Sequence, residues 1–164
     1  MNQPIVIREF QPGDDEAFRL LNEEWITRYF RLEPKDIEVL GDPQSSILSK
    51  GGRILFAVDD GRCIGCCALL RLSPEEYEIA KMAVTGTHQR GGIGRQLLQA
   101  TCETARALGA RRLWLETNRA LAPAIHLYES LGFQHVPLER ATPSPYARSD
   151  VQMEKYFDWS ATRV

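Results

Sequence analysis

Three glycines lie within four positions of the sequence, at Gly91, Gly92 and Gly94, with Arg90 and Arg95 on either side. An apolar pattern with helical spacing begins directly after them. The first N–H groups of a helix lack partners, and glycine lets an anion approach them without interference from a side chain. The residues therefore predict a phosphate-binding loop, with charge-assisted contacts from the two arginines. The alternative interpretation is a flexible surface turn.

Two common phosphate-loop motifs do not fit this segment. The P-loop motif ends in Gly-Lys-Ser/Thr, whereas this loop continues as Gly94-Arg95-Gln96. The dinucleotide motif G-x-G-x-x-G requires a third glycine at the position of Leu97. A nucleotide-binding protein is therefore a distant alternative.

The loop must be positioned by the strand before it and the helix after it, in a chain whose patterns alternate between both types of element. We predict strands over 5–10, 53–58, 62–72, 77–84, 112–117, 133–138 and 150–156. Helices are predicted over 14–30, between Pro34 and Pro43, and over 92–108 and 121–131. This order predicts an α/β (α+β) fold with a mixed central sheet, and the 164 residues suit a single domain over 1–164.

Composition excludes several classes of partner. The formal net charge is −2, so the chain has no overall basic character for binding nucleic acid. We see no secretory signal and no apolar run near the ~20 residues that span a bilayer, which predicts a cytoplasmic protein without a membrane partner. Cys63 and Cys66 form a C-x-x-C, but no second ligand pair completes a metal site. We interpret both as core residues of a strand and expect no metal.

The segment Gln89-Arg90-Gly91-Gly92-Ile93-Gly94 resembles the acetyl-CoA pyrophosphate loop of the Gcn5-related N-acetyltransferase (GNAT) family. Three further segments resemble this family in its own order, and the resemblance runs from about Ile5 to Tyr156. They are EYEIAKMAV (76–84), similar to the fourth strand, LWLETN (113–118), similar to the fifth, and AIHLYESLGF (124–133). Family loops often read Q-G-x-G-x-G, so Arg90 and Gly91 depart from the usual pattern. The resemblance implies a mostly antiparallel mixed sheet with helices on both faces.

This resemblance implies transfer of an acetyl group from acetyl-CoA to an amine by direct attack in a ternary complex. The loop is then expected to hold the pyrophosphate, while the strand backbone at 82–84 pairs with the pantetheine arm and stabilises the oxyanion. Asn118 is a hydrogen-bond partner for the cofactor or an ordinary turn residue. The expected cofactor-binding residues are Met82, Ala83, Val84, Gln89, Arg90, Gly91, Gly92, Ile93, Gly94, Arg95 and Asn118.

Two residues are expected to move protons. Tyr128 matches the family tyrosine that protonates the leaving thiolate, and its alternative is a core tyrosine. An amine is mostly protonated at pH 7, so it needs a base, for which Glu78 is our candidate. Strand alternation puts Glu78 and Lys81 on opposite faces, and a glutamate that faces solvent is the alternative. His126 lies on another side of the helix from Tyr128, so we interpret it as a surface residue.

The acceptor is less well defined by the sequence. In this family it binds between the first helices and the loop before the last strand, here residues 25–42 and 142–150. Their aromatic and charged side chains suit a small-molecule amine, a zwitterion or an amine with a carboxylate. Acetylation of a protein, or a non-catalytic acyl-CoA sensor, remains open. A toxin acting on aminoacyl-tRNA is disfavoured by the acidic composition. Family members often dimerise, so a homodimer is a further option.

Overall fold

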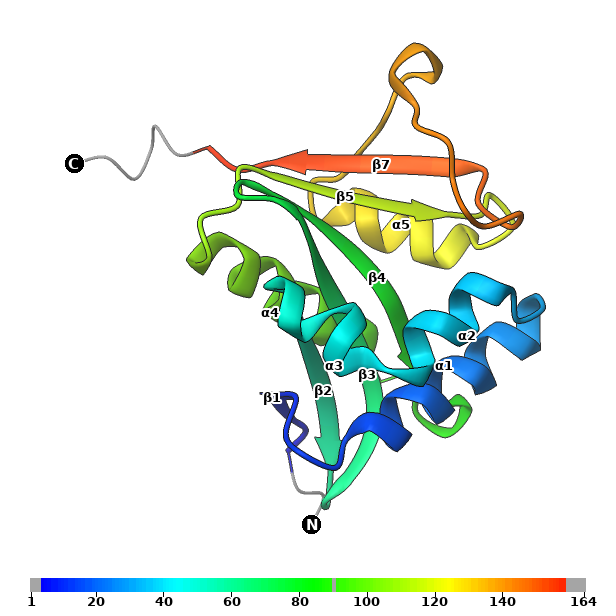
Figure 1. The fold of residues 1–164 in the computed structure, drawn as a ribbon, viewed down its shortest axis with the longest axis vertical. Helices are drawn as coiled ribbons and strands as arrows, with labels where there is room; N and C mark the ends of the chain where they lie inside the picture. The colour runs from blue at the N-terminus through cyan, green and yellow to red at the C-terminus, as the bar shows by residue number, and fades with distance from the viewer. Residues whose placement is uncertain (1–3, 90, 159–164) are drawn as a thin grey trace.

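A computed structural model of the chain describes residues 4–89 and 91–158 (Figure 1). Its strands form one seven-stranded sheet in the order β1-β2-β3-β4-β5-β7-β6. Every neighbouring pair is antiparallel except β4 and β5, which are parallel. The mixed, mostly antiparallel sheet is therefore confirmed. The strands are β1 (Val6–Glu9), β2 (Arg53–Asp59), β3 (Arg62–Ser73), β4 (Glu76–Val84), β5 (Arg112–Thr117), β6 (Gln134–His135) and β7 (Val151–Tyr156).

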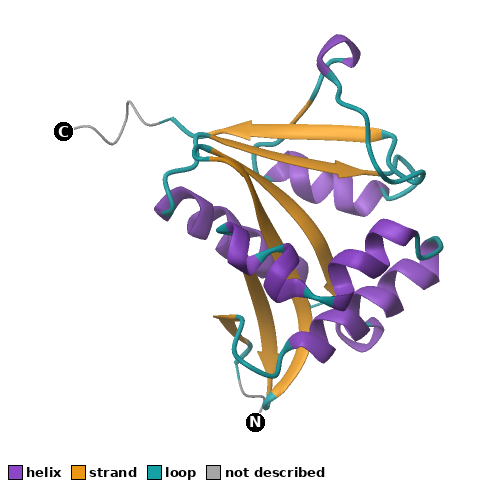
Figure 2. Cartoon of the chain, in the orientation of Figure 1, coloured by secondary structure: helices purple, strands orange, loops and turns teal. Residues whose placement is uncertain are grey.

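Helices cover both faces of the sheet, as the resemblance implies (Figure 2). The α-helices are α1 (Asp15–Tyr29), α2 (Pro34–Gly41), α3 (Pro43–Ser46), α4 (Ile93–Ala107) and α5 (Ala122–Ser130). The described residues also form three short 3₁₀ turns. They are η1 (Leu48–Lys50) after α3, η2 (Gly86–His88) between β4 and α4, and η3 (Leu138–Arg140) between β6 and β7. In the part of the chain that the structure describes, no helix is both long and apolar enough to span a membrane.

One predicted strand is much shorter than expected. The sequence favours a strand over 133–138, but the strand covers only Gln134–His135, and the Val136 N–H makes one more hydrogen bond to Gln152 of β7. Pro137 follows with φ −59° and leads directly into η3. Proline has no N–H to donate to a sheet and fixes its own φ, so the strand ends before it.

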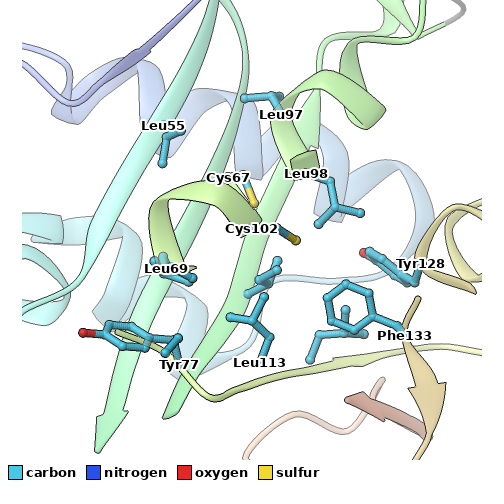
Figure 3. Close-up of a cluster of buried hydrophobic side chains, with 14 of the residues drawn as sticks. Leu55, Cys67, Leu69, Tyr77, Leu97, Leu98, Cys102, Leu113, Tyr128 and Phe133 are labelled. Atoms are coloured by element: carbon cyan, nitrogen blue, oxygen red, sulfur yellow. The ribbon is translucent and has the colours of Figure 1, made fainter. Parts of the chain in front are cut away.

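The core lies in two layers, because side chains on a strand alternate between its faces. In β2, Leu55 and Ala57 belong to the core layer under α4, whereas Ile54 and Phe56 belong to the layer under α1 and α2. Figure 3 shows the first layer, where Leu55 lies with Leu97 and Leu98 of α4. The two layers hold the helices on opposite faces of the sheet.

Cys66 and Cys67 of β3 belong to this core, whereas Cys63 is half-buried and packs against its edge. Cys66 and Cys67 are fully buried on opposite faces of the strand, and all four cysteines of the chain are free. Burial raises the pKa of the Cys67 thiol to about 12, so this thiol stays protonated. The residues 4–89 and 91–158 contain no cluster of three or more His, Cys, Asp or Glu side chains that could hold a metal ion.

Strand β4 contains a bulge that changes the direction of its side chains. Its residues Ala80 and Ala83 pair with Ala68 and Cys66 of β3, so two residues of β4 lie opposite Cys67 alone. Lys81, inside this bulge, has φ +52°. The prediction from simple alternation was therefore wrong for Lys81, because the extra residue shifts the alternation. Its ammonium group points toward α2, on the face that Glu78 occupies.

Strands β4 and β5 separate after a short parallel pairing. They pair only from Glu76–Glu78 with Arg112–Trp114. Beyond this point β5 continues to pair with β7, while β4 follows β3 and diverges from β5 (Figure 1). The edge of β4 that faces β5 is therefore without a neighbouring strand from Ile79 onward.

Candidate active site

A cavity of about 710 Å³ lies at the gap between β4 and β5. Its wall includes residues from both faces of the sheet, namely α1 and α2 on one face and α5 on the other. The segment 142–150 between η3 and β7 closes a further side, and we call it the strap. Because the sheet is open here, one compartment reaches α4 and α5 on one face and α1 and α2 on the other. We expect the cofactor at the first and the acceptor at the second, and we call them the cofactor side and the acceptor side.

The glycine loop lies at the α4 end of this compartment. Gly92 is the N-cap of α4 and has φ +74°, a left-handed conformation that favours glycine. The Gln89 side chain donates to the carbonyl oxygen of Val84 at 3.3 Å and so ties the loop to β4. Ile93 is buried in the core, so only its backbone can face an anion. The loop thus presents the N–H groups of a helix start at the end of β4.

Of the two arginines in the loop, the structure describes only Arg95. Arg95 is exposed and donates to the Ser130 hydroxyl at 2.9 Å. This contact holds its guanidinium near the end of α5. Arg90 lies outside the described residues, so its predicted contact with phosphate stays a prediction.

The predicted site residues divide into two groups. Glu78, Met82, Ala83, Val84, Gln89, Gly94, Asn118 and Tyr128 line the cavity together. Gly91, Gly92, Ile93 and Arg95 lie beside it, in the loop and the first turn of α4. The structure therefore brings the proposed acid, base and pantetheine-binding backbone to one space, with the glycine loop at its end.

A substitution at Gly92 tests the loop. Gly92→Val places a β-branched residue in a left-handed conformation, which forces the loop away from its present path. We expect the affinity for acetyl-CoA to fall by about tenfold or more, the loss of one or two charge-assisted hydrogen bonds. Gly109→Val is the matched control, because Gly109 has φ +91° at the far end of α4. Calorimetric titration that finds equal affinities in the two variants contradicts the assignment.

Tyr128 is held with its hydroxyl at the cavity. Its ring is buried and packs edge-on against Phe133, with centroids 6.0 Å apart (Figure 3). The hydroxyl makes no hydrogen bond with any residue that the structure describes, and it is not sealed from the cavity. Burial, with a smaller contribution from Cys67, raises the pKa of Tyr128. The hydroxyl is therefore protonated at neutral pH and available as a donor.

Glu78 lies on the acceptor side of the same cavity. Burial raises its pKa to about 7, and the charge of Glu116 adds to this shift, while Lys81 opposes it. Within residues 4–89 and 91–158, no hydrogen bond or ion pair engages the Glu78 carboxyl. A carboxyl group with a pKa near 7 can accept a proton efficiently at physiological pH.

Asn118 is largely occupied by the local structure. Its Oδ1 accepts from the Ala120 N–H, and its Nδ2 donates to the Arg148 carbonyl oxygen, both at 2.8 Å. These bonds form the turn after β5 and hold the strap beside it. The geometry favours the turn interpretation, and contact with the cofactor stays a prediction.

A buried ion-pair network that we did not predict holds the strap. The Asp36 carboxylate is fully buried and accepts from Lys81 Nζ at 2.7 Å and from both terminal nitrogens of Arg148 at 2.7 Å. Burial alone would raise the pKa of Asp36, but the Arg148 and Lys81 hydrogen bonds lower it to about 2. The three charges therefore remain ionised and joined at neutral pH.

Further contacts fix the strap to the first helices. Glu33 accepts from the Ala147 N–H at 2.9 Å and from Arg148 at 3.2 Å. The Tyr146 hydroxyl lies 3.0 Å from Lys81 Nζ, and its ring contacts the guanidinium of Arg148. The resemblance indicated both segments but not the ion pairs between them, because residues 36 and 148 are far apart in the chain. The strap is thus a fixed wall of the cavity.

Loss of the contact between Arg148 and Asp36 should destabilise the strap. Arg148→Gln removes the bidentate contact with Asp36 and leaves Lys81 as its remaining cation. We expect a loss of about 1–3 kcal/mol in the free energy of unfolding, the usual cost for a buried charged hydrogen bond. Proteolysis within 142–150 should also accelerate. Arg111→Gln is the control, because the Arg111 side chain is 57% exposed and pairs with Glu75, away from the strap. Equal protease resistance of the two variants contradicts the role of the network.

Comparisons with known proteins relate the sequence and the fold of this chain to acetyltransferases. The model of the acetyltransferase (GNAT) family matches residues 15–133. Streptothricin acetyltransferase of Streptomyces lavendulae is 41% identical over 163 residues, covering 82% of this chain and 84% of that protein. The ribosomal protein bS18 alanine N-acetyltransferase of Escherichia coli K12 is 33% identical over 93 residues, 56% of this chain and 63% of that protein. YncA from Salmonella typhimurium, solved with its cofactor acetyl-CoA, is similar in fold, with a TM-score of 0.72, 19% identity and 95% coverage of both chains.

Proposed function

The chain belongs to the GNAT acetyltransferase family, and we propose that it transfers the acetyl group of acetyl-CoA to a primary amine of a small molecule. The observation that carries this proposal is the single cavity that Glu78, Tyr128 and the free edge of β4 share. An acid, a base and a strand edge for the pantetheine arm are what direct transfer from a thioester to an amine requires.

In the proposed reaction, Glu78 takes a proton from the bound ammonium group, directly or through a water molecule. The amine nitrogen then attacks the thioester carbonyl carbon, and a backbone N–H of β4 stabilises the negative oxygen. As the carbon–sulfur bond breaks, the Tyr128 hydroxyl gives its proton to the leaving thiolate. The attacking nitrogen releases its second proton to solvent, and the products are the N-acetylated amine and CoA. Solvent then returns a proton to Tyr128 and takes up the proton that Glu78 accepted.

A small acceptor is favoured because the strap closes the side of the cavity at α2. Glu33 and Asp36 hold Arg148 and the backbone of Ala147 there, so this wall limits the room for an extended peptide on that side. The relative from Streptomyces lavendulae is named for streptothricin, a small-molecule substrate. The relative from Escherichia coli acts on an alanine of a ribosomal protein, so a protein acceptor is the second candidate.

A thermal-shift titration with acetyl-CoA, CoA and ATP tests the cofactor first, because a ligand that binds only the native state raises the melting temperature. We expect stabilisation by both CoA species and none by ATP. Thiol release from acetyl-CoA with a panel of small amines and an N-terminal peptide then tests the acceptor. Release with the peptide alone would overturn the small-molecule proposal, and binding without release would indicate an acyl-CoA sensor.

The pKa of Glu78 predicts the pH dependence of the reaction. Below about pH 7 Glu78 is protonated and cannot accept a proton, so kcat/KM should fall there with unit slope in its logarithm. This carboxyl is faced by Glu116 of β5, Lys81 of β4 and Tyr146 of the strap, and Asp36 of α2 pairs with Lys81. Since the acceptor amine also titrates, the Glu78 inflection is identified by its loss in Glu78→Gln. Retention of an inflection near 7 in that variant contradicts the assignment.

A further inference from the structure

Two carboxyl groups, Glu78 of β4 and Glu116 of β5, face the cavity where the two strands separate. Their charges interact across this gap. Glu116 accepts a hydrogen bond from the Ser149 hydroxyl at 2.9 Å, a neutral partner. Neither group forms an ion pair with a described residue. Both carboxyl groups are therefore available to a ligand.

The positive charges of the same wall are engaged elsewhere. Lys81 and Arg148 are joined to the buried Asp36, and Arg148 also contacts Glu33. Lys35 lies 3.5 Å from Glu38 at the exposed edge of the cavity. Because Lys81 and Arg148 are paired with Asp36 and Glu33, the described residues of the acceptor side leave the carboxyl groups of Glu78 and Glu116 without an ion-pair partner.

The rest of the acceptor side is aromatic. Trp25 and Tyr29 of α1, whose ring centroids lie 5.3 Å apart, line the cavity together with Trp114 of β5. Aromatic faces attract ammonium groups and pack well against aliphatic chains. Such a lining suits a hydrocarbon chain that ends in cations.

Building on the proposed function, we propose that the acceptor is a small amine with at least two ammonium groups. One group lies at Glu78 and is acetylated, while the second is bound by Glu116 and serves only for recognition. Glu78 is paired with Trp114 on the neighbouring strand, about 5 Å away, and Glu116 is a further two residues, about 7 Å, along β5. A short aliphatic chain can bridge this separation.

A diamine acceptor differs from the zwitterion that the sequence indicated. A carboxylate close to the reacting amine would face two carboxyl groups, while both candidate cationic partners, Lys81 and Arg148, are held by Asp36. Like charges at such a distance disfavour binding. Amino acids are therefore expected to be poorer acceptors than diamines of the same length.

Three probes of equal chain length test the second site: 1,4-diaminobutane, n-pentylamine and 5-aminopentanoate. They place an ammonium group, a methyl group or a carboxylate at the same end of the chain. We expect kcat/KM to be about tenfold or more higher for the diamine than for the monoamine, with the amino acid lowest. Glu116→Gln should bring the ratio of diamine to monoamine close to one. Glu103→Gln, the same change on the exposed side of α4, should keep the wild-type ratio.

Calorimetric binding of the three probes in the presence of CoA separates the two proposals. If the diamine binds tighter than the monoamine, and Glu116→Gln removes this difference, the second site is supported even where no acetyl transfer follows. Transfer without any preference for the diamine overturns the second site and leaves the acetyltransferase proposal intact. A preference that survives Glu116→Gln in a normally folded variant also overturns it.

Discussion

Glu78→Gln is expected to lower kcat/KM for the acceptor amine by about 10²–10⁴-fold above pH 7, the range that a positioned general base contributes. Glutamine keeps the size and polarity of the side chain but cannot accept the proton that the ammonium must lose. Affinity for acetyl-CoA should change little, because Glu78 lies on the acceptor side of the cavity. Steady-state kinetics with thiol detection measures the loss.

The same variant should be more stable than the wild type above pH 7. An unfolded glutamate has a pKa near 4.5, whereas the pKa of folded Glu78 is about 7. Between these values the folded state binds more protons, so stability falls as the pH rises through this window. Glutamine does not titrate and avoids that loss. A melting temperature above the wild-type value therefore excludes misfolding as the cause of lost activity.

The control for Glu78→Gln is again Glu103→Gln, which changes an exposed glutamate outside the cavity. Its activity and its melting temperature should both match the wild type. Activity within a few-fold of wild type in Glu78→Gln would show that another group, or solvent alone, removes the amine proton.

Tyr128→Phe is expected to lower kcat by about 100-fold, at the lower end of general acid catalysis because water can replace part of the donor function. The ring remains to pack against Phe133, so the fold should be preserved. KM for acetyl-CoA should change much less than kcat, since the hydroxyl acts on the leaving sulfur in the transition state. Kinetics at varied acetyl-CoA concentration separate the two parameters.

Tyr156→Phe is the matched change for this experiment, because Tyr156 lies at the end of β7 and is 61% exposed. It should keep normal kcat. If Tyr128→Phe lowers the melting temperature but keeps normal kcat, the residue is a core tyrosine and the thiolate takes its proton from elsewhere.

The sequence predicted the sheet and its helices because their signals are local. Alternating and helical spacing located nearly every element within about two residues, and Gly92 marked the start of α4. Pro137 shortened β6, an effect that a residue pattern alone underestimates. The glycines and arginines indicated a phosphate-binding loop by themselves, whereas the assignment to acetyl-CoA and the role of Tyr128 came from the resemblance.

The acceptor side was harder to predict because its parts meet only after folding. The bulge at Lys81 is a property of the pairing between β3 and β4, and it reverses the face that alternation assigns. Asp36 and Arg148 are distant in sequence, and nothing near either residue indicates its partner. The sequence placed Glu116 in a predicted strand but indicated no role for it. Its effect on the pKa of Glu78 depends on where β4 and β5 separate.

Mass spectrometry can test directly whether this protein transfers an acetyl group to an amine. The donor is acetyl-CoA labelled with ¹³C in the acetyl group, and the acceptor is 1,4-diaminobutane. We predict that the wild-type protein forms the labelled N-acetyl product in step with CoA release and that Glu78→Gln forms little of it. Release of CoA with labelled acetate alone, or tight binding of acetyl-CoA without any amine becoming labelled across the amine and peptide panel, would contradict the account.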